Sequence, residues 1–194
     1  MQYTRINTKD IPDVLNKKDQ HCTGHVYLMN SDYDILLGHN KKYKNVCSFG
    51  GFASPGESLA DTVLREFQEE TLGTVMNSEA LSELILTKSI MITRTSPKGR
   101  HYTLFCNSNA FDFDLDLINA TFALKLTDPN LTADQLENDY VTIVNLKSVS
   151  AVIEQNKLDT TDINGFVVHL REINIPAYKW LISALANDEL KNFY

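Results

Sequence analysis

Apolar and polar residues alternate along the first quarter of the chain with the two-residue period of a β-strand. The run Gly-His-Val-Tyr-Leu-Met at residues 24–29 is followed by a polar turn at residues 30–32 and by further apolar residues at 34–37. Two such runs on either side of a short polar turn predict a β-hairpin. Residues 46–49 predict another short strand that leads into a glycine-rich loop, and residues 11–16 predict a short helix.

The period changes to that of an α-helix after the glycine-rich loop. At about 100° per residue, one arc of segment 58–72 collects most of its apolar side chains. This arc consists of Ala60, Val63, Leu64, Phe67 and Thr71. Either Glu57 or Ser58 can begin the helix, and Gly73 can end it. We therefore expect a helix that packs on the core through Phe67 and its neighbours.

The second half of the chain predicts another hairpin and two more strands. Apolar segments 84–94 and 101–110 lie on either side of a basic turn at residues 97–99, which is typical of a hairpin. Residues 122–126 and 140–146 are rich in strand-forming side chains and predict one strand each.

Three C-terminal features complete the predicted outline. Segment 111–117 alternates regularly, but its aspartates are poor strand formers, so it is either an edge segment or a loop. The pattern of segment 163–173 is ambiguous. Pro176 suits the first turn of a final helix, for which Asn174 is a candidate cap. Apolar residues at helical spacing follow and are expected in the core; they are Ala177, Trp180, Leu181, Ala184 and Leu185.

The bulk composition is that of an ordinary globular protein. With 194 residues, 43% hydrophobic and 22% charged, the chain fits one domain with additional elements at its ends. No apolar run approaches the roughly 20 residues that cross a membrane. The polar start at residues 1–5 lacks the apolar core of a signal peptide. Three widely spaced cysteines, Cys22, Cys47 and Cys106, are typical of reduced thiols, so we expect a cytoplasmic protein.

Positive charge is concentrated in two loop-like segments, although the formal net charge is −7. That total argues against broad, non-specific nucleic-acid binding. Segment 39–44 contains Lys42, and segment 94–101 contains Arg94, Lys98 and Arg100. Both segments are either solvated loops or loops that hold the phosphates of a substrate.

Acidic residues gather on the predicted helix 58–72. Glu66, Glu69 and Glu70 lie beside its apolar arc, because offsets of three and four residues bring side chains together. Glu57, one turn ahead, can bend back toward the same edge. Clustered carboxylates repel one another unless cations neutralise them, and hard oxygen ligands suit Mg²⁺ or Mn²⁺. The alternative is a solvated acidic face in which Arg65 pairs with a glutamate.

The order of these residues resembles the signature of the Nudix hydrolases, enzymes that cleave nucleoside diphosphates linked to another moiety. Five residues separate Gly51 from Glu57, and seven more lead to the pair Arg65-Glu66. An apolar residue, a spacer and the pair Glu69-Glu70 follow. The resemblance covers residues 51–73. It departs from the family pattern at Leu72-Gly73, where the usual order of glycine and apolar residue is reversed.

The resemblance implies a fold and a division of the chain. The fold class is α/β, a Nudix-type α/β/α sandwich with a mixed β-sheet. We expect the Nudix hydrolase domain at residues 20–150, an N-terminal segment at residues 1–19, and a C-terminal helical extension at residues 151–194 that packs on the same domain.

The resemblance also implies roles for individual residues. The metal ligands would be Glu66, Glu69 and Glu70, with Glu57 bound directly or through water and the backbone of Gly51 as an additional ligand. Arg65 would orient the glutamates. The general base would be either a helix glutamate such as Glu66 or an acid on a later loop. The candidates for the second case are Glu137 and Asp139.

The predicted function is metal-dependent hydrolysis of the pyrophosphate bond in a nucleoside diphosphate derivative, with a small nucleotide as substrate and Mg²⁺ or Mn²⁺ as cofactor. Phosphates beyond the metals would contact Arg94, Lys98, Arg100 and Lys42. Removal of the 5′ cap from mRNA is one alternative, and a catalytically silent, nucleotide-binding regulatory domain is another. Both a monomer and a homodimer are compatible with the sequence.

Overall fold

The computed structural model describes residues 3–18, 21–109, 113–187 and 189–190. Its centre is a mixed sheet of eight described strands in the order β1-β6-β7-β2-β3-β4, with β5 paired to β2 and β8 paired to β3. Strands β2 and β7 run parallel, and the remaining described pairs of this sheet are antiparallel. The strands are β1 (Thr4–Arg5), β2 (Cys22–Met29), β3 (Asp34–Asn40), β4 (Asn45–Cys47), β5 (Phe49–Phe52), β6 (Ser89–Ser96), β7 (Gly99–Asn107) and β8 (Asn138–Asn145).

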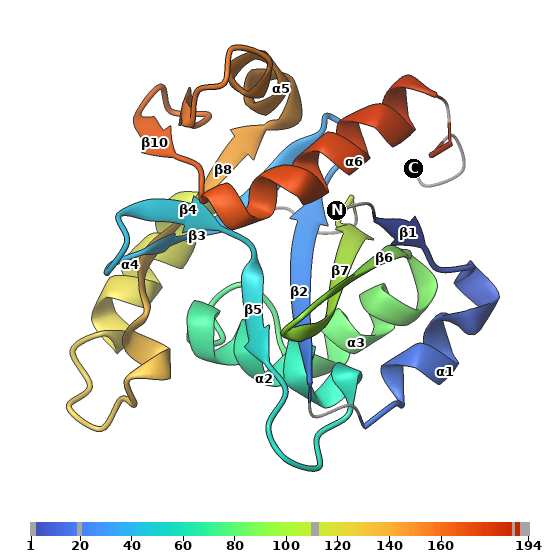
Figure 1. Ribbon diagram of the computed structural model, residues 1–194. Helices are drawn as coiled ribbons and strands as arrows, with labels where there is room; N and C mark the ends of the chain where they lie inside the picture. The colour runs from blue at the N-terminus through green and yellow to red at the C-terminus, as the bar shows by residue number, and fades with distance from the viewer. Residues whose placement is uncertain (1–2, 19–20, 110–112, 188, 191–194) are drawn as a thin grey trace.

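Helices cover both faces of this sheet (Figure 1). The α-helices are α1 (Ile11–Leu15), α2 (Leu59–Thr71), α3 (Ser78–Thr87), α4 (Leu115–Lys125), α5 (Leu146–Glu154) and α6 (Ile175–Ala186). Short 3-10 turns occupy η1 (Thr8–Asp10), η2 (Asp134–Leu136) and η3 (Glu172–Asn174), and β9 (Asp159–Thr161) pairs with β10 (Val167–His169) as a separate hairpin.

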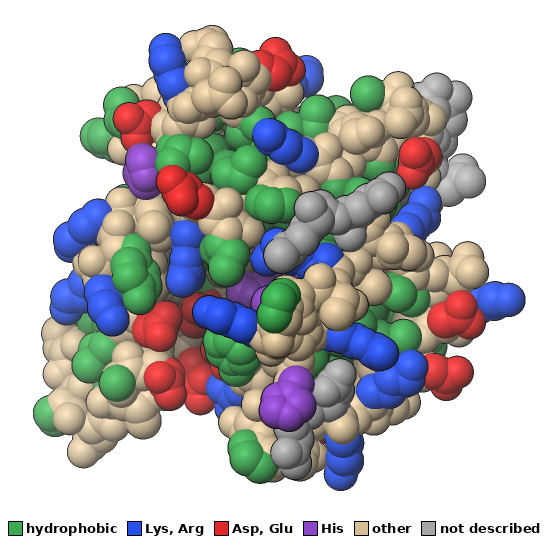
Figure 2. Space-filling model, in the orientation of Figure 1, with side chains coloured by type: hydrophobic (Ala, Val, Ile, Leu, Met, Phe, Trp, Pro, Cys, Tyr) green, Lys and Arg blue, Asp and Glu red, His purple; other side chains and the backbone are tan. Residues whose placement is uncertain are grey.

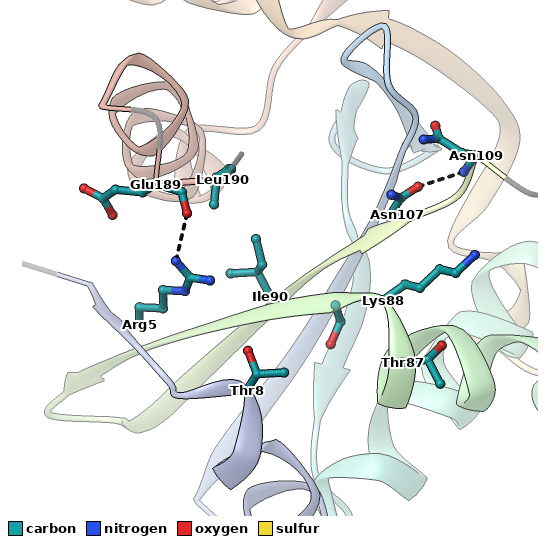
Figure 3. A pocket seen from close by; sticks show the side chains of 10 residues that line it. Arg5, Thr8, Thr87, Lys88, Ile90, Asn107, Asn109, Glu189 and Leu190 are labelled. Atoms are coloured by element: carbon teal, nitrogen blue, oxygen red, sulfur yellow. Dashed lines mark hydrogen bonds between the residues drawn. The ribbon is translucent and has the colours of Figure 1, made fainter. Parts of the chain in front are cut away.

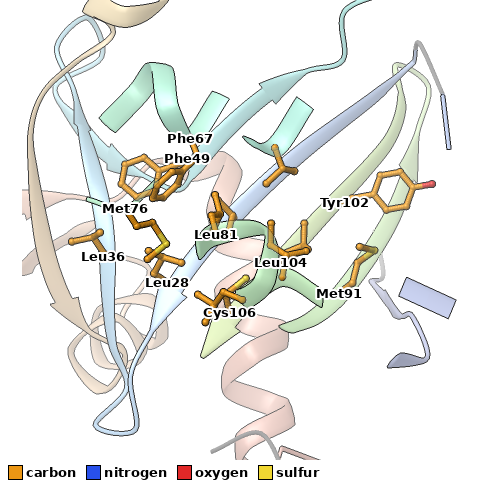
Figure 4. Packing of buried hydrophobic residues seen from close by; sticks show 14 of the residues in the cluster. Leu28, Leu36, Phe49, Phe67, Met76, Leu81, Met91, Tyr102, Leu104 and Cys106 are labelled. Atoms are coloured by element: carbon orange, nitrogen blue, oxygen red, sulfur yellow. The ribbon is translucent and has the colours of Figure 1, made fainter. Parts of the chain in front are cut away.

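The alternation of β2 divides the core into two layers. Val26 and Leu28 face the layer that includes α1 to α4, whereas Tyr27 and Met29 face the layer that includes α5 and α6. In the first layer, Phe67 of α2 packs edge-on against Phe49 of β5, with ring centroids 5.1 Å apart (Figure 4). A mixed sheet between two helical layers confirms the predicted α/β/α sandwich.

The signature helix α2 is defined by its caps. Ser58, not Glu57, is the N-cap, and it forms a capping box with Asp61 that satisfies two otherwise unpaired backbone N–H groups. The helix ends at Leu72, whose φ of 51° lies in the left-handed region that favours glycine. The reversed Leu72-Gly73 order therefore places a branched side chain where glycine would be relaxed. Lys125 of α4 donates to the Leu72 carbonyl oxygen at 2.6 Å.

Both predicted hairpins are confirmed. Leu28 pairs with Leu36 across the β2–β3 turn, and Arg94 pairs with His101 across the β6–β7 turn. The predicted glycine-rich loop starts later than expected, because Gly50 lies within β5 and pairs with His25 of β2.

Two strand predictions are wrong because short apolar runs also suit helices. Residues 84–87 end α3, in which Leu81, Leu84 and Ile85 bury one helical face, and β6 starts only at Ser89. Residues 122–125 end α4, whose buried Ile118 and Phe122 are four residues apart.

Residues 110–112 lie outside the described residues. In the remainder of segment 111–117, an aspartate explains the structure. Asp114 caps α4 by accepting the backbone N–H of Leu117 at 3.0 Å, so residues 115–117 are helical rather than edge or loop.

The C-terminal helix occurs where it was predicted. Asn174 occupies the N-cap position of α6, although its side chain makes no capping hydrogen bond, and Pro176 lies in the first turn. Trp180 stacks on Phe105 at 6.2 Å between ring centroids, in agreement with its predicted role in the core. Cys22, Cys47 and Cys106 are buried thiols, and no disulfide joins them. Within the described residues, no helix combines the length and the apolar character needed to cross a membrane.

Candidate active site

Helix α2 approaches the sheet closely because β2 carries a glycine where the two elements meet. A β-carbon on Gly24 would lie 2.6 Å from Cγ2 of Val63 and 2.9 Å from Cδ1 of Leu59. The apolar side of α2 is therefore seated directly on β2. This seating fixes the acidic side of the helix beside the glycines of β5.

Arg65 holds three signature glutamates together. Its Nε donates to Oε1 of Glu57 at 2.7 Å, and its Nη1 donates to Glu66 and to Glu69, both at 2.9 Å. Its Nη2 donates to the backbone oxygen of Phe52 at 3.1 Å. The rigid fork of a guanidinium suits several carboxylates at once. Among the described residues, no three His, Cys, Asp or Glu side chains already form a metal-binding group.

Glu57 closes the loop ahead of α2. Besides its two bonds from Arg65, it accepts the backbone N–H of Ser54 at 2.8 Å and the hydroxyl of Thr62 at 3.2 Å. These donors, first the hydrogen bond from Arg65, lower the pKa of Glu57 to about 2. Glu57 is therefore a fixed anion at neutral pH.

Glu70 lies on the inner side of the cluster, against β5. Its Oε2 accepts the backbone N–H of Gly50 at 2.7 Å, and the side chain of Asn138 donates to its backbone oxygen at 3.2 Å. Burial raises the pKa of Glu70 well above 4.5, and repulsion from Glu66 and Glu137 adds to this effect.

Gly51 provides the space for the Glu66 carboxyl group. A β-carbon at Gly51 would lie 2.5 Å from both Cδ and Oε1 of Glu66, a separation that real β-carbons do not show. Burial raises the pKa of Glu66, while Arg65 opposes that effect. The glycine strand thus leaves the partly buried carboxyl group of Glu66 and the buried carboxyl group of Glu70 against bare backbone.

The two loop candidates for the general base, Glu137 and Asp139, occupy different surroundings. Glu137 acts electrostatically on both Glu66 and Glu70, and it is held by Asn40, whose Nδ2 donates to its Oε2 at 3.4 Å. The structure thus brings Glu137 to the cluster from a segment some seventy residues away in sequence.

Asp139 is engaged elsewhere. Its Oδ1 lies 2.5 Å from Nδ1 of His39, where the β3–β8 register shifts. The His39 ring in turn stacks on Tyr140 with centroids 4.4 Å apart. Among the described residues, no hydrogen bond or ion pair joins Asp139 to the signature glutamates.

The predicted phosphate-binding residues do not form one group. Arg94 and His101 lie on the α6 side of the sheet, because they share the strand alternation of Ile92 and Phe105. Arg100 shares the alternation of Tyr102 and faces the opposite layer. Lys98 is exposed at the turn.

Lys42 lies at the β3–β4 turn, with its Nζ 5.2 Å from the centroid of the exposed Tyr43 ring. Sequence analysis missed a second cation on the same ring, Arg171, whose guanidinium carbon is 5.2 Å from that centroid. The backbone N–H of Arg171 donates to the Val46 oxygen at 3.1 Å. Its charge acts on both Glu70 and His25. Nothing in the local sequence around residue 171 indicates this role, which depends on the C-terminal segment returning to β4.

Acidic and basic side chains meet on one face of the molecule. Figure 2 shows acidic side chains beside a hollow in which histidine and basic side chains are visible. A larger cavity of about 750 Å³ lies at another part of the sheet, where Arg5, Lys88 and Asn107 contribute to its lining (Figure 3). It contains none of the signature glutamates.

Several solved structures resemble this fold. One is the bifunctional NMN adenylyltransferase/ADP ribose pyrophosphatase of Francisella tularensis, with 14% identity and a TM-score of 0.49 over 91% of this chain and 45% of that one. The C. elegans Ap4A hydrolase shows 11% identity and a TM-score of 0.45 over 85% and 98%. A NUDIX family hydrolase from Clostridium perfringens shows 18% identity and a TM-score of 0.42 over 87% and 99%. At these values the likeness says nothing about substrate. No protein of curated function matches the chain in sequence.

Residues 20–113 match the family model of the NUDIX domain. This segment includes the whole signature from Gly51 to Gly73 and the strands on which α2 rests. The resemblance inferred from the signature is thereby confirmed. The chain therefore contains a Nudix domain.

Proposed function

We propose that the protein hydrolyses a phosphoanhydride bond in a nucleoside diphosphate derivative with the help of divalent cations. The observation that carries this proposal is the convergence of five carboxyl groups on the glycine strand β5. Arg65 gathers three of them, Gly50 binds the fourth through its N–H group, and the fifth, Glu137, directly follows η2 and acts electrostatically on Glu66 and Glu70.

The residues of this cluster suit Mg²⁺ or Mn²⁺. All the donors are hard oxygens, and the carboxyl groups of the partly buried Glu66 and the buried Glu70 have raised pKa values, because desolvation and like charges oppose their ionisation. A nearby divalent charge would relieve that opposition. The ligands would be Glu57, Glu66, Glu69, Glu70 and the backbone oxygen of Gly51. When bound, the cations supply compensation for phosphate charge and lower the pKa of water.

The protein side chains have distinct tasks in this proposal. Arg65 holds the glutamates at fixed positions relative to one another, and the limited space at Gly51 fixes the direction of the Glu66 side chain. Glu137 accepts a proton from the attacking water, whose oxygen forms a bond to phosphorus as the bridging P–O bond breaks. The products are a nucleoside monophosphate and the phosphorylated remainder of the substrate. Asp139, bound to His39, is given no catalytic task.

A substrate panel tests the proposal, with products measured after incubation with Mg²⁺ or Mn²⁺. The panel contains nucleoside diphosphate sugars, dinucleoside polyphosphates, nucleoside triphosphates and capped RNA, so it also tests cap removal. We expect hydrolysis of at least one member and its loss, by about 10²-fold or more, in Glu66→Gln. The exposed Glu79 of α3 provides the control, and Glu79→Gln should keep full activity. A protein inactive on the whole panel, or equally active after both substitutions, would contradict the proposal.

A further inference from the structure

The C-terminal segment places an arginine beside β4, on the face of the sheet that carries the carboxyl cluster. Leu170 bridges Val46 of β4, and both side chains are buried in the layer of the core that includes α6. Arg171 continues in extended backbone, with φ −71° and ψ 124°. Successive side chains of extended backbone point to opposite faces, so Arg171 and Cys47 point away from that layer. They share the face of Phe49, which packs against α2.

Contacts on this face connect Cys47 with Glu70. Gly38 of β3 is the cross-strand partner of Cys47, and a β-carbon at Gly38 would collide with the side chain of Asn138. The Nδ2 atom of Asn138 donates to the backbone oxygen of Glu70 at 3.2 Å. Arg171 therefore lies on the same side of the sheet as the glutamates of α2.

Two described contacts hold the Arg171 side chain. Its guanidinium carbon is 5.2 Å from the centroid of the Tyr43 ring, and its guanidinium donates a hydrogen bond to the thiol of Cys47. Tyr43 is 54% exposed, and its backbone N–H donates to Oδ1 of Asn40 at 3.0 Å. The same Asn40 side chain donates to Glu137. The ring under Arg171 is thus tied to the segment that carries the candidate base.

The guanidinium of Arg171 has donors that no described carboxylate uses. Arginine carries five N–H donors and keeps its charge in proteins. Among the described residues, no Asp or Glu forms an ion pair with Arg171, whereas Arg65 binds three glutamates. The charge of Arg171 nevertheless acts on Glu70, where it opposes the rise in pKa that burial causes. An anion that reaches the carboxyl cluster therefore lies near an arginine that can bind it.

The carboxyl cluster and Arg171 belong to two diverging parts of the sheet. β4 pairs with β3, whereas β5 pairs with the first half of β2. β2 pairs with β3 near its other end, at Leu28 and Met29. Figure 1 shows β5 turning away from β4 toward α2. A chain of linked phosphoryl groups that is bound at the cluster can therefore extend toward the β4 part.

We propose that Arg171 binds a phosphoryl group of the substrate from the β4 side of the carboxyl cluster. The inference rests on the proposed function, which supplies a substrate with at least two linked phosphoryl groups. The carboxyl cluster accounts for one part of this polyanion through bound cations, and the planar fork of a guanidinium matches the oxygens of another part. Tyr43 is then a positioning residue, because it acts on the substrate through Arg171. Lys42, over the same ring, adds positive charge at the exposed edge.

Binding of an uncleavable diphosphate tests the proposal. The probe is methylenediphosphonate, in which a CH₂ group replaces the bridging oxygen, and it is titrated calorimetrically into the full chain at constant free Mg²⁺. We expect Arg171→Gln to raise the Kd of the probe about 10- to 100-fold, as the loss of charge-assisted hydrogen bonds would. Arg5→Gln is the matched control, because Arg5 is exposed in β1 at the opposite edge of the sheet. It should change the Kd less than about twofold.

Two further positions of comparison separate direct binding from the effect of charge alone. Arg171→Lys keeps the positive charge but loses the fork, so its Kd should lie between those of the wild type and Arg171→Gln. Tyr43→Ala removes the ring that positions the guanidinium and should raise the Kd about two- to fivefold, the range of an exposed cation–π contact. Tyr43→Phe keeps the face of the ring and should restore binding. The Tyr43 pair also covers the case in which Arg171→Gln does not fold.

Three results would overturn the proposal. They are a wild type that does not bind the probe, an unchanged Kd in Arg171→Gln, and complete recovery of binding in Arg171→Lys. The rise in Tm that Mg²⁺ alone causes should not shrink in Arg171→Gln, because this substitution removes no carboxylate. A smaller rise together with weaker probe binding would mean that Arg171 supports the metal ligands, which would also overturn direct binding.

Kinetics separates this inference from the proposed function. With a substrate that the wild type cleaves, Arg171→Gln should raise KM more than it lowers kcat. The titration requires no turnover, so its result does not depend on the substrate panel. If the panel shows no hydrolysis while probe binding depends on Arg171, the proposed function fails and the phosphate-binding role of Arg171 stands. If hydrolysis occurs and Arg171→Gln keeps the wild-type KM, this inference alone fails.

Discussion

The carboxyl group of Glu66 occupies the space that any side chain at position 51 would fill. A β-carbon on Gly51 would meet the carboxyl carbon of Glu66 at 2.5 Å. Packing against a functional side chain thus explains the glycine at the start of the signature. An unusual backbone conformation does not explain it, because the φ angles above zero belong to other glycines such as Gly50 and Gly56.

Gly51→Ala should therefore reduce activity without unfolding the protein. The added methyl group collides with the end of a side chain that can rotate away, so the fold is expected to survive while Glu66 leaves its position. We expect kcat to fall at least about tenfold, because misplacement by 1 Å can cost 10²-fold. Gly56→Ala should behave in the opposite way. Its φ of 86° makes alanine costly by about 1 kcal/mol in stability, while the open space around it leaves activity intact.

Arg65→Lys should show that the shape of the guanidinium matters beyond its charge. One ammonium group cannot reproduce the separate bonds of Nε, Nη1 and Nη2 to Glu57, Glu66 and Glu69. We expect kcat/KM to fall by about tenfold or more, with near-native circular dichroism. Wild-type activity in this variant would show that Arg65 only neutralises charge.

Glu137→Gln and Asp139→Asn should separate the two candidate bases. Glu137 acts electrostatically on Glu66 and Glu70, whereas Asp139 is bound to His39. We expect Glu137→Gln to reduce kcat by roughly 10²- to 10⁴-fold, the usual contribution of a general base. Asp139→Asn should stay within a few-fold of the wild type. A larger loss in Asp139→Asn than in Glu137→Gln would exchange their roles.

His25 should make the stability of the fold depend on pH in the mildly acidic range. Its pKa is about 4 in the folded protein, below the ordinary histidine value of 6.5 that applies once the chain unfolds, so the unfolded chain binds more protons between these values. This contribution is fully present above pH 6.5 and is lost as the pH falls toward 4. The slope is at most about 1.4 kcal/mol per pH unit. We expect the free energy of unfolding, measured by urea titration at several pH values, to fall less steeply between pH 8 and pH 4 in His25→Gln than in the wild type. Equal dependence on pH in the two proteins would contradict this account.

Sequence patterns predicted an element correctly where two independent features of the sequence supported that element. Helix α2 combines an apolar arc with the cap at Ser58, and the β6–β7 hairpin combines alternation with a turn at residues 97–98. Residues 84–87 and 122–125 were wrongly predicted as strand, because a run of three apolar residues suits either a strand or the end of a helix. In both cases the deciding residue was a cap far upstream, Asn77 for α3 and Asp114 for α4.

The site was predictable only where its residues are close in sequence. The spacing of the signature was enough to group Glu57, Arg65 and Glu66, and the structure shows their contacts. Tertiary relationships such as the approach of Arg171 to β4 have no local signal. The basic turn shows the same limit, since strand alternation sends Arg94 and Arg100 to opposite faces, which a count of charges does not reveal.

Metal dependence tests the central claim most directly. The wild type, freed of metal with EDTA, is assayed on the cleaved substrate while Mg²⁺ or Mn²⁺ is added back, and thermal unfolding is followed in parallel. We predict no hydrolysis in EDTA, recovery on addition of the cation, and a cation-induced rise in Tm that Glu70→Gln reduces, because the cluster around Arg65 and Gly50 is a repulsive set of carboxyl groups. Full activity in EDTA would contradict the account.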